Sequence, residues 1–192
     1  MVLGLDIDGV VADFLSDFLL VLEKRIGRGP ITAESITSFN FSDHPVLTKK
    51  AVRDCMEMVS YDPLFWSKLS SLITPLEWKR LAVLSYRGEL VFITQRHVRT
   101  TYDIHGVTCD WLKLHGVNKP VVHCTPNKKG ELVRNLGIQL FVDDRYENCR
   151  EVAENSQAIV LMPNRPYNRS FQHPGVNKIQ NFSEIFAHLD LA

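Results

Sequence analysis

The sequence predicts an α/β fold, a doubly wound parallel sheet that carries a small helical insert between its first and second strands. Three observations support this. Short aliphatic runs alternate with longer segments of helical periodicity, these runs are apolar on both faces, and about eighty residues separate the first run from the second. Strands that are apolar on both faces and alternate with helices are typical of parallel sheets covered on each side.

Five strands are predicted from runs of β-branched and aliphatic residues. They cover Val2–Ile7, Glu89–Ile93, Pro120–His123, Gln139–Val142 and Ala158–Leu161. Helices are expected between the later strands, over Thr101–His115, Lys128–Leu136 and Tyr146–Glu154. Gly116 and Gly137 follow two of these helices and are expected to end them, while Gly88 marks the turn into the second strand.

The long segment between the first two strands exceeds a simple crossover connection and is predicted to form the insert. Its helices are expected over Phe14–Ile26, Val46–Ser60 and Pro75–Tyr86. The chain would then divide into a sheet domain of residues 1–13 and 87–192 and a helical cap of residues 14–86. The cap contains aromatic residues that are expected mainly to form its own small core: Phe39, Phe41, Phe65, Trp66 and Trp78.

The composition argues against several classes of function. The 22 basic and 22 acidic residues cancel, so no surplus charge attracts nucleic acid or an anionic membrane. No stretch approaches the ~20 apolar residues of a membrane span, and early acidic residues argue against a secretory signal. Four widely spaced cysteines form no CxxC pair and are expected to be free thiols: Cys55, Cys109, Cys124 and Cys149. We therefore expect a soluble protein of the reducing cytoplasm.

Polar side chains follow several of the predicted strands. In an open parallel sheet, ligands bind beyond the carboxyl ends of the strands. The polar residues at these ends are Asp6 and Asp8 after the first strand, Thr94 after the second, Lys128 and Lys129 after the third, and Asp143 and Asp144 after the fourth. Four carboxylates, a hydroxyl and one or two ammonium groups are therefore expected to meet at one edge of the sheet.

So many carboxylates at close range repel one another or raise each other's pKa unless a cation lies among them. Mg²⁺ takes oxygen ligands and typically joins one or two carboxylates to a substrate phosphate. Threonine and lysine then suit the remaining phosphoryl oxygens, as a hydrogen-bond donor and a point charge. The pattern indicates Mg²⁺-dependent chemistry on a phosphate ester.

Each motif alone also has a simpler explanation. Asp-x-Asp-Gly is common in turns, the pair Asp143-Asp144 could cap the following helix, threonine is ordinary in strands, and lysines are usually solvated. An EF-hand loop is excluded, because Val10 and Val11 stand where that loop needs a ligand and a glycine. The order and placement of the motifs together are more specific than any one of them.

The set Asp6-Ile7-Asp8-Gly9, Thr94, Lys128/Lys129 and Asp143-Asp144 resembles the four motifs of the haloacid dehalogenase-like (HAD) phosphohydrolase superfamily. The resemblance implies a Rossmann-like core with a C1 cap between motifs one and two. The string "DIDGVVADF", in which Phe14 follows the motif, is closest to the 5'(3')-deoxyribonucleotidase branch, and "LFWSKL", "PYNR" and "NKIQNFSEI" are also similar to it. Gln95-Arg96 and an apparently longer cap depart from that branch, which bears on the substrate and not on the chemistry.

The resemblance also implies roles for the acidic residues. Asp6 would be the nucleophile that becomes an aspartyl phosphate, and Asp8 would protonate the leaving oxygen and then activate water. The Asp6 carboxylate, the Asp8 backbone carbonyl and a carboxylate of motif four would hold the Mg²⁺. Asp144 is preferred for that last position, with Asp143 orienting the lysine or a metal-bound water.

Thr94 would donate to a phosphoryl oxygen, and a lysine would offset charge in the transition state. Lys129 is preferred for this role, although the spacing leaves Lys128 open. Residues that could contact the substrate are Phe14, Phe65, Trp66, Gln95 and Arg96. Phe65 and Trp66 are adjacent and point in different directions, so both are not expected to do so. Arg96 and Arg145 could instead form structural ion pairs.

The leading hypothesis is a Mg²⁺-dependent phosphomonoesterase, a 5'(3')-nucleotidase acting on (deoxy)nucleoside monophosphates. One alternative is a HAD phosphatase of other small phosphate esters. Another is a polynucleotide 3'-phosphatase, against which the neutral net charge argues. The last is a non-catalytic homologue that binds metal or phosphate. The base and sugar preference and a homodimer are left open.

Overall fold

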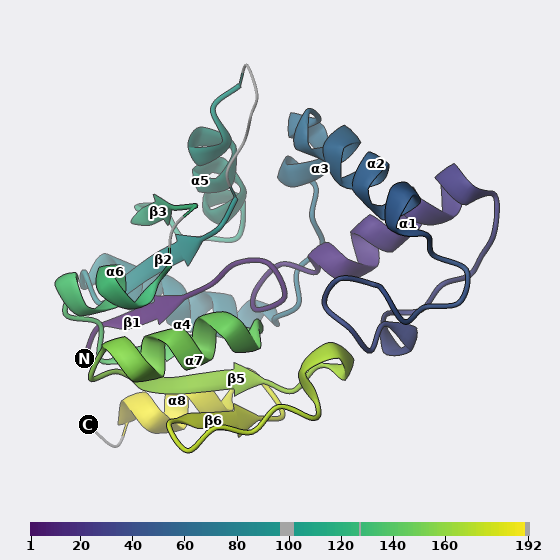
Figure 1. The fold of residues 1–192 in the computed structure, drawn as a ribbon. Coiled ribbons are helices and arrows are strands. Elements are labelled where there is room, and N and C mark those ends of the chain that lie inside the picture. Colours follow the sequence, from purple (N-terminus) through teal and green to yellow (C-terminus); the bar gives the residue numbers. More distant parts are fainter. Residues whose placement is uncertain (97–101, 127, 191–192) are drawn as a thin grey trace.

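The computed structural model describes residues 1–96, 102–126 and 128–190 (Figure 1). Within this part of the chain, six strands form one sheet in the order β3-β2-β1-β4-β5-β6, and all neighbouring strands are parallel. The strands are β1 (Leu3–Leu5), β2 (Leu90–Thr94), β3 (Val122–Cys124), β4 (Leu140–Val142), β5 (Ile159–Pro163) and β6 (Val176–Ile179). This confirms the predicted doubly wound parallel sheet.

The strand β6 is the one strand of this sheet that the sequence analysis did not predict. It lies at the edge of the sheet beside β5, and among its four residues only Ile179 is buried. An edge strand with one buried side chain has neither a continuous apolar run nor a clear alternation, so its sequence resembles a loop.

Eight helices and two short 3₁₀ turns occur in the described residues. They are α1 (Phe14–Ile26), η1 (Ala33–Ser35), α2 (Lys49–Ser60), α3 (Pro63–Ser67), α4 (Pro75–Tyr86), α5 (Ile104–Leu114), α6 (Gly130–Asn135), α7 (Tyr146–Asn155), η2 (Pro166–Asn168) and α8 (Glu184–Asp190). The predicted bounds of α1 and α4 are confirmed. The helix α2 begins later than expected, because the Thr48 hydroxyl accepts the N–H of Ala51 and caps it.

Other helix ends also follow local signals. Gly116 and Gly137 come just after the last residues of α5 and α6 and have positive φ angles of 94° and 63°, which confirms that they end these helices. Thr101, the expected first residue of α5, lies outside the described residues. The five-residue helix α3 was not predicted, since it is too short to show a helical period.

Helices cover both faces of the sheet (Figure 1). On one face α4, α5 and α8 pack against the strands, and the buried side chains of this layer include Leu5, Phe92, Val142, Trp78, Trp111 and Phe186. On the other face α6 and α7 pack against the strands, with Ile93, Phe141, Val160, Val133 and Val152. Alternate strand residues supply the two layers, as a sheet that is buried on both sides requires.

A third hydrophobic cluster lies in the cap, which projects beyond the carboxyl ends of the strands (Figure 1). It joins α1, the loop around η1 and α2 through Phe18, Leu22, Ile36, Phe41, Cys55 and Val59. Phe41 therefore belongs to the cap core as expected. Phe39, in contrast, is 41% exposed, and Phe65 and Trp66 pack against both the cap cluster and the sheet layer.

The buried face of helix α4 packs in the sheet layer, although the sequence analysis assigned this helix to the cap. Its buried residues Trp78 and Leu81 lie in the sheet layer, together with Leu69 and Ile73 just before it. An amphipathic helix shows which of its faces is apolar and not which surface that face covers. We propose a cap of residues 14–68 in place of 14–86.

Candidate active site

A cavity of about 420 Å³ lies at the carboxyl edge of the sheet, between the sheet and the cap. The central strand β1 has β2 on one side and β4 on the other. The strands that follow in sequence extend the sheet first in one direction from β1, as β2 and β3, and then in the opposite direction, as β4, β5 and β6. Open parallel sheets bind ligands at such a topological switch point. The register pairs Leu5 with Phe92 of β2 and Val142 of β4, so the next residue, Asp6, stands beside the end of β4, where Asp143 and Asp144 follow.

The chain turns sharply after β1. The carbonyl of Ile7 accepts the N–H groups of Val10, Val11 and Ala12 at 3.3, 2.9 and 2.9 Å, and Gly9 has a φ angle of 80°. A Cβ at position 9 would overlap the carboxylate of Asp144. Glycine is therefore required at position 9 for two reasons: the backbone is left-handed there, and the carboxylate of Asp144 approaches too closely to leave room for a Cβ.

Lys129 lies at the start of α6 and is fully buried among the carboxylates. Its Nζ donates to Asp6 Oδ1 at 2.5 Å, to Asp143 Oδ2 at 2.6 Å and to the carbonyl of Ile93 at 2.9 Å. Lys128 is exposed. The structure thus brings Lys129 into the acidic cluster and leaves Lys128 exposed to solvent.

The two motif-four carboxylates differ in their surroundings. Asp143 is held by Lys129, by the backbone N–H of Arg145 at 2.9 Å and by the Asn148 side chain at 3.1 Å. Asp144 accepts a hydrogen bond from the Tyr167 hydroxyl at Oδ2. Asp143 is therefore engaged at both oxygens by protein donors.

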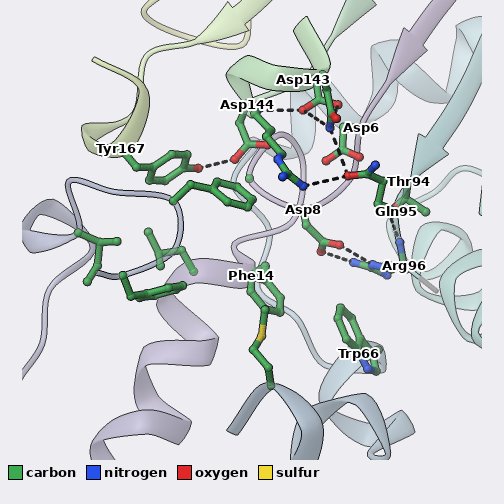
Figure 2. Close-up of a pocket in the computed structure, with 18 of the residues that line it drawn as sticks. Asp6, Asp8, Phe14, Trp66, Thr94, Gln95, Arg96, Asp143, Asp144 and Tyr167 are labelled. Atoms are coloured by element: carbon green, nitrogen blue, oxygen red, sulfur yellow. Dashed lines mark hydrogen bonds and ion pairs between the residues drawn. The ribbon is translucent and has the colours of Figure 1, made fainter. Parts of the chain in front are cut away.

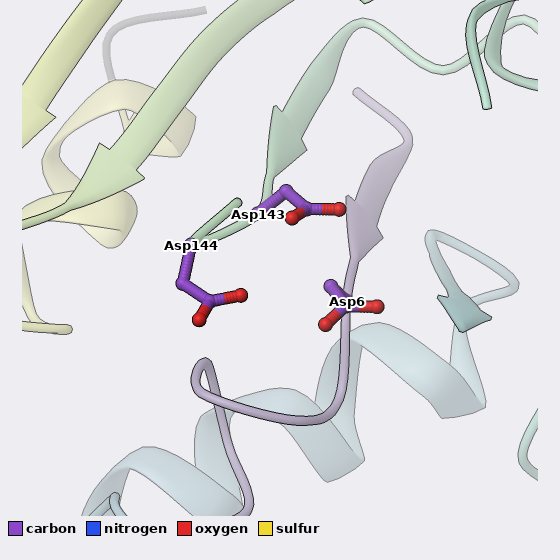
Figure 3. Close-up of side chains that lie close together, drawn as sticks. All are labelled: Asp6, Asp143 and Asp144. Carbon is purple, nitrogen blue, oxygen red and sulfur yellow. The ribbon is translucent and has the colours of Figure 1, made fainter. Parts of the chain in front are cut away.

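Figure 3 shows Asp6, Asp143 and Asp144 turned toward one another. One oxygen from each of the three lies within 4.8 Å of the other two, and all three residues are buried. Burial raises the pKa of Asp6 well above its usual range, although Lys129 opposes the shift. Burial and the charge of Asp143 raise the pKa of Asp144 to about 7. When ionised, these three carboxylates carry more negative charge than Lys129 balances.

The donor set fits a hard divalent cation. It consists of buried carboxylate oxygens, without the sulfur or imidazole ligands that zinc prefers. Lys129 supplies one positive charge: burial by itself would lower the pKa of this lysine, but Asp143 and Asp6 outweigh that effect and raise it. A cation beside Asp6 and Asp144 would offset the remaining negative charge.

Thr94 ends β2, and Arg96 follows it two residues later at the same edge of the sheet. The Thr94 side chain is buried, lines the cavity, and accepts the backbone N–H of Arg96 at 3.2 Å. The Arg96 guanidinium donates from Nη2 to Asp8 Oδ1 at 2.7 Å and from Nε to Asp8 Oδ2 at 2.8 Å (Figure 2). The side chain of Asp8 thus points to Arg96, whereas the other three aspartates face one another.

The expected substrate-contacting residues lie in two places. Phe14 and Trp66 line the cavity with rings stacked 5.6 Å apart, and Gln95 and Arg96 line it from the sheet side. Phe65 packs edge-on against Phe14 at 5.8 Å and is not among the described residues that line the cavity. Of these two adjacent residues, Trp66 lines the cavity and Phe65 does not, and the contact of either one with substrate stays a prediction.

Sequence reasoning missed several cavity residues. The cap also contributes Leu15, Ile36, Phe39, Phe41 and Met56, and the core contributes Pro126, Asn148 and Tyr167. Most of them lie in loops or on apolar helix faces, where nothing in the local sequence separates a cavity wall from a core. Only Tyr167 lies in a string that the sequence analysis singled out, "PYNR".

The turn η2 ties together the two loops that carry the aspartates. Tyr167 donates to the Asp144 carboxylate, and the Asn168 amide donates to the Asp144 carbonyl at 2.7 Å. Arg165 donates from Nη2 to the carbonyl of Gly9 at 2.8 Å. The loop after β1 and the end of β4 are thereby fixed relative to each other.

The chain is similar to several known proteins. The profile of a family described as "5' nucleotidase, deoxy (Pyrimidine), cytosolic type C protein" matches residues 1–189. Two bacterial relatives have names that propose nucleotidase activity. BH1399 of Halalkalibacterium halodurans is 27% identical, with 97% of this chain and 91% of that protein aligned. YqfW of Bacillus subtilis is 23% identical, with 95% and 90% aligned.

A solved structure shares the fold. It is a HAD-superfamily hydrolase of subfamily IA from Geobacter sulfurreducens, similar over 100% of this chain and 98% of that one with a TM-score of 0.54 and 18% identity. In the part of the chain that the structure describes, we find no helix of sufficient length and apolarity to span a membrane. The chain belongs to the 5' nucleotidase family whose profile spans it, and it is a hydrolase of phosphate monoesters.

Proposed function

We propose that the protein is a Mg²⁺-dependent 5'(3')-nucleotidase that hydrolyses (deoxy)nucleoside monophosphates through an aspartyl phosphate on Asp6. One observation carries the proposal. The buried carboxylate of Asp6 lies between Lys129 and the motif-four aspartates, at the base of a cavity whose cap side is aromatic. A nucleophile, charge compensation for a phosphate and an apolar wall for a base are thus combined in one space.

Asp6, Asp144 and the backbone carbonyl of Asp8 would hold the Mg²⁺. Asp143 is assigned the supporting role, because Lys129, Arg145 and Asn148 already engage both of its oxygens. When bound, Mg²⁺ supplies positive charge to the phosphoryl oxygens and offsets repulsion between the phosphate and the carboxylates. The rest of the chemistry belongs to side chains of the chain itself.

In the first step an oxygen of Asp6 attacks the phosphorus atom. The bond between phosphorus and the nucleoside oxygen breaks, its electron pair stays on the leaving oxygen, and this oxygen takes a proton from Asp8. Thr94 and Lys129 would stabilise the equatorial oxygens, as a hydroxyl donor and an ammonium group. The products of this step are the free nucleoside and the phosphorylated Asp6.

In the second step a water attacks the phosphorus atom of the aspartyl phosphate. Asp8, now a carboxylate, accepts the proton of that water, and the bond between phosphorus and the Asp6 oxygen breaks. Phosphate leaves, Asp6 is again a carboxylate and Asp8 is again protonated. Dividing one difficult displacement into two easier ones is the advantage of covalent catalysis.

The shape of the cavity supports a nucleoside as the leaving group. Its volume of about 420 Å³ falls within the roughly 300–1,000 Å³ of small-molecule sites. Phe14, Phe39 and Trp66 stand on the cap side, where a base could stack. The family description and the names of both bacterial relatives point to nucleotides. A cytoplasmic location belongs to the proposal, because all four cysteines are free thiols.

A phosphate-release assay tests the proposal. We expect turnover of nucleoside 5'- and 3'-monophosphates with Mg²⁺, loss of activity with a chelator, and loss in Asp6→Asn. An Asp6→Asn protein as active as wild type would remove the mechanism. Faster turnover of sugar phosphates would remove the nucleotide assignment, and preferred release from a 3'-phosphorylated oligonucleotide would favour the polynucleotide phosphatase. Metal binding without turnover of any ester would favour a non-catalytic homologue.

A further inference from the structure

The buried guanidinium of Arg96 is anchored on several sides. Besides the two bonds to Asp8, its Nη1 donates to the Thr108 hydroxyl on α5 at 3.2 Å, and the ring of Trp66 from the cap lies 5.1 Å from its Cζ. The Arg96 side chain is 1% exposed, and that of Asp8 is 23% exposed. A rigid, buried partner therefore holds a carboxylate that reaches into the cavity.

We propose that Arg96 is a positioning residue that sets the place and plane of the Asp8 carboxylate for both proton transfers. The inference rests on the proposed function, in which Asp8 gives a proton to the leaving oxygen and later takes one from water. Two parallel N–H···O bonds fix both the position and the plane of a carboxylate, which a single lysine ammonium does not do. Without this fork, the partly exposed Asp8 side chain is free to turn toward solvent.

The leaving group distinguishes positioning from a general structural role. A nucleoside alkoxide must be protonated as it leaves, whereas p-nitrophenolate leaves without a proton. The ratio kcat/KM reports the steps up to the transfer of phosphorus to Asp6, so it contains the acid step and excludes hydrolysis of the aspartyl phosphate. For Arg96→Gln we expect kcat/KM to fall about 10–100-fold with a nucleoside monophosphate, as for misplaced acid catalysis, and to change little with p-nitrophenyl phosphate.

The second proton transfer provides an independent readout. If Asp8 is misplaced as a base, the aspartyl phosphate forms normally from p-nitrophenyl phosphate and is then hydrolysed slowly. Arg96→Gln should therefore show a burst of one p-nitrophenolate per active site in stopped flow, with a lower kcat. Arg96→Lys keeps the charge and loses the fork, so it should lie between wild type and Arg96→Gln in both measurements.

A double-mutant cycle tests whether Arg96 acts through Asp8. In an Asp8→Asn background, Arg96→Gln should cause no further loss with the nucleotide, because coupled residues are not additive. Thr108→Val is the matched control, because it removes one hydrogen bond to the Arg96 guanidinium and leaves both bonds between Arg96 and Asp8. In this variant the ratio of kcat/KM values for the two substrates should stay at the wild-type value. Circular dichroism and thermal melting check that each variant is folded.

The outcomes separate this inference from the proposed function. If Asp8→Asn keeps the wild-type ratio of the two substrates, the proposed mechanism itself fails. If Asp8→Asn changes the ratio and neither Arg96 variant does, only the positioning role is overturned. The positioning role would also be overturned if the Arg96 variants lost kcat/KM equally with both substrates, or if the losses of Asp8→Asn and Arg96→Gln multiplied in the double variant. The same conclusion would follow if Thr108→Val altered the ratio of the two substrates as the Arg96 variants do.

Discussion

Replacing Lys129 with methionine tests the electrostatic balance of the site. The lysine side chain has no exposed surface and forms ion pairs of 2.5 and 2.6 Å with Asp6 and Asp143, plus a bond to the carbonyl of Ile93. Methionine has a similar length and no charge, so the change leaves two buried carboxylates without their shared partner. We expect strong destabilisation and loss of phosphatase activity.

The size of the effect follows from these contacts. Removing one partner of a buried ion pair costs about 3–5 kcal/mol. Part of this loss is recovered because burial already raises the pKa of Asp6, which can take up a proton in the variant. We therefore expect the free energy of unfolding to fall by about 3 kcal/mol at pH 7, the lower end of this range. For a chain of this size, that loss corresponds to a fall in melting temperature on the order of 6–12 °C. The loss should shrink at pH 5, where protonation of Asp6 is easier.

The assay is urea and thermal unfolding in the presence of a chelator. Lys128→Met is the matched control, since it removes the adjacent exposed lysine and should unfold at the wild-type midpoint. Adding Asp143→Asn to Lys129→Met removes one unpaired charge and should recover part of the lost stability. The reasoning is refuted if Lys129→Met and Lys128→Met have equal midpoints, or if Lys128→Met loses the activity that Lys129→Met retains.

Three further predictions concern the metal site. Gly9→Ala should weaken Mg²⁺ binding in calorimetry, because the added Cβ overlaps Asp144. Gly88→Ala is the control: Gly88 has a similar φ of 73° and no atom within 4 Å of an added Cβ, so this variant should bind Mg²⁺ normally. Equal affinities of the two variants would contradict this prediction. Tyr167→Phe removes the hydroxyl that orients Asp144 and should weaken Mg²⁺ about 10-fold, and unchanged affinity would show that the hydroxyl does not support the ligand. Burial raises the pKa of Asp144 to about 7 in the folded, metal-free protein, above its unfolded value of about 3.9. The folded state then binds the extra proton, so the free energy of unfolding should fall as pH rises from about 4 to 7 in chelator. Asp144→Asn should flatten that dependence in unfolding scans, and an unchanged slope would exclude Asp144 as its source.

Local pattern is sufficient for elements whose signal lies within a few neighbouring residues. The aliphatic runs that became β1, β2 and β4 were recognisable because strands buried on both faces are apolar throughout. Asp6, Thr94 and Asp143 could be placed at one edge because parallel strands end on the same side. The bounds of α1 and α4 followed from helical periodicity, and the structure adds side-chain caps from Asp13 and Thr74 at their first turns.

Other features depended on contacts that no local pattern records. The packing of α4 on the sheet depends on the surfaces left open by other elements. The strand β6 exists because β5 offers it an edge. The turn η2 reaches Gly9 across 156 positions of the sequence through Arg165.

Local pattern was enough to predict five of the six strands of the described sheet, the insert and the acidic residues at the strand ends, since each depends on a short-range periodicity or on the direction of a strand. Only the tertiary structure distinguished Lys129 from Lys128, because two adjacent lysines are alike until one of them is buried against Asp6 and Asp143. It also paired Arg96 with Asp8, which lie 88 positions apart. Burial and charge pairing are properties of the assembled fold, and these decide which polar residues are free to react and which hold others in place.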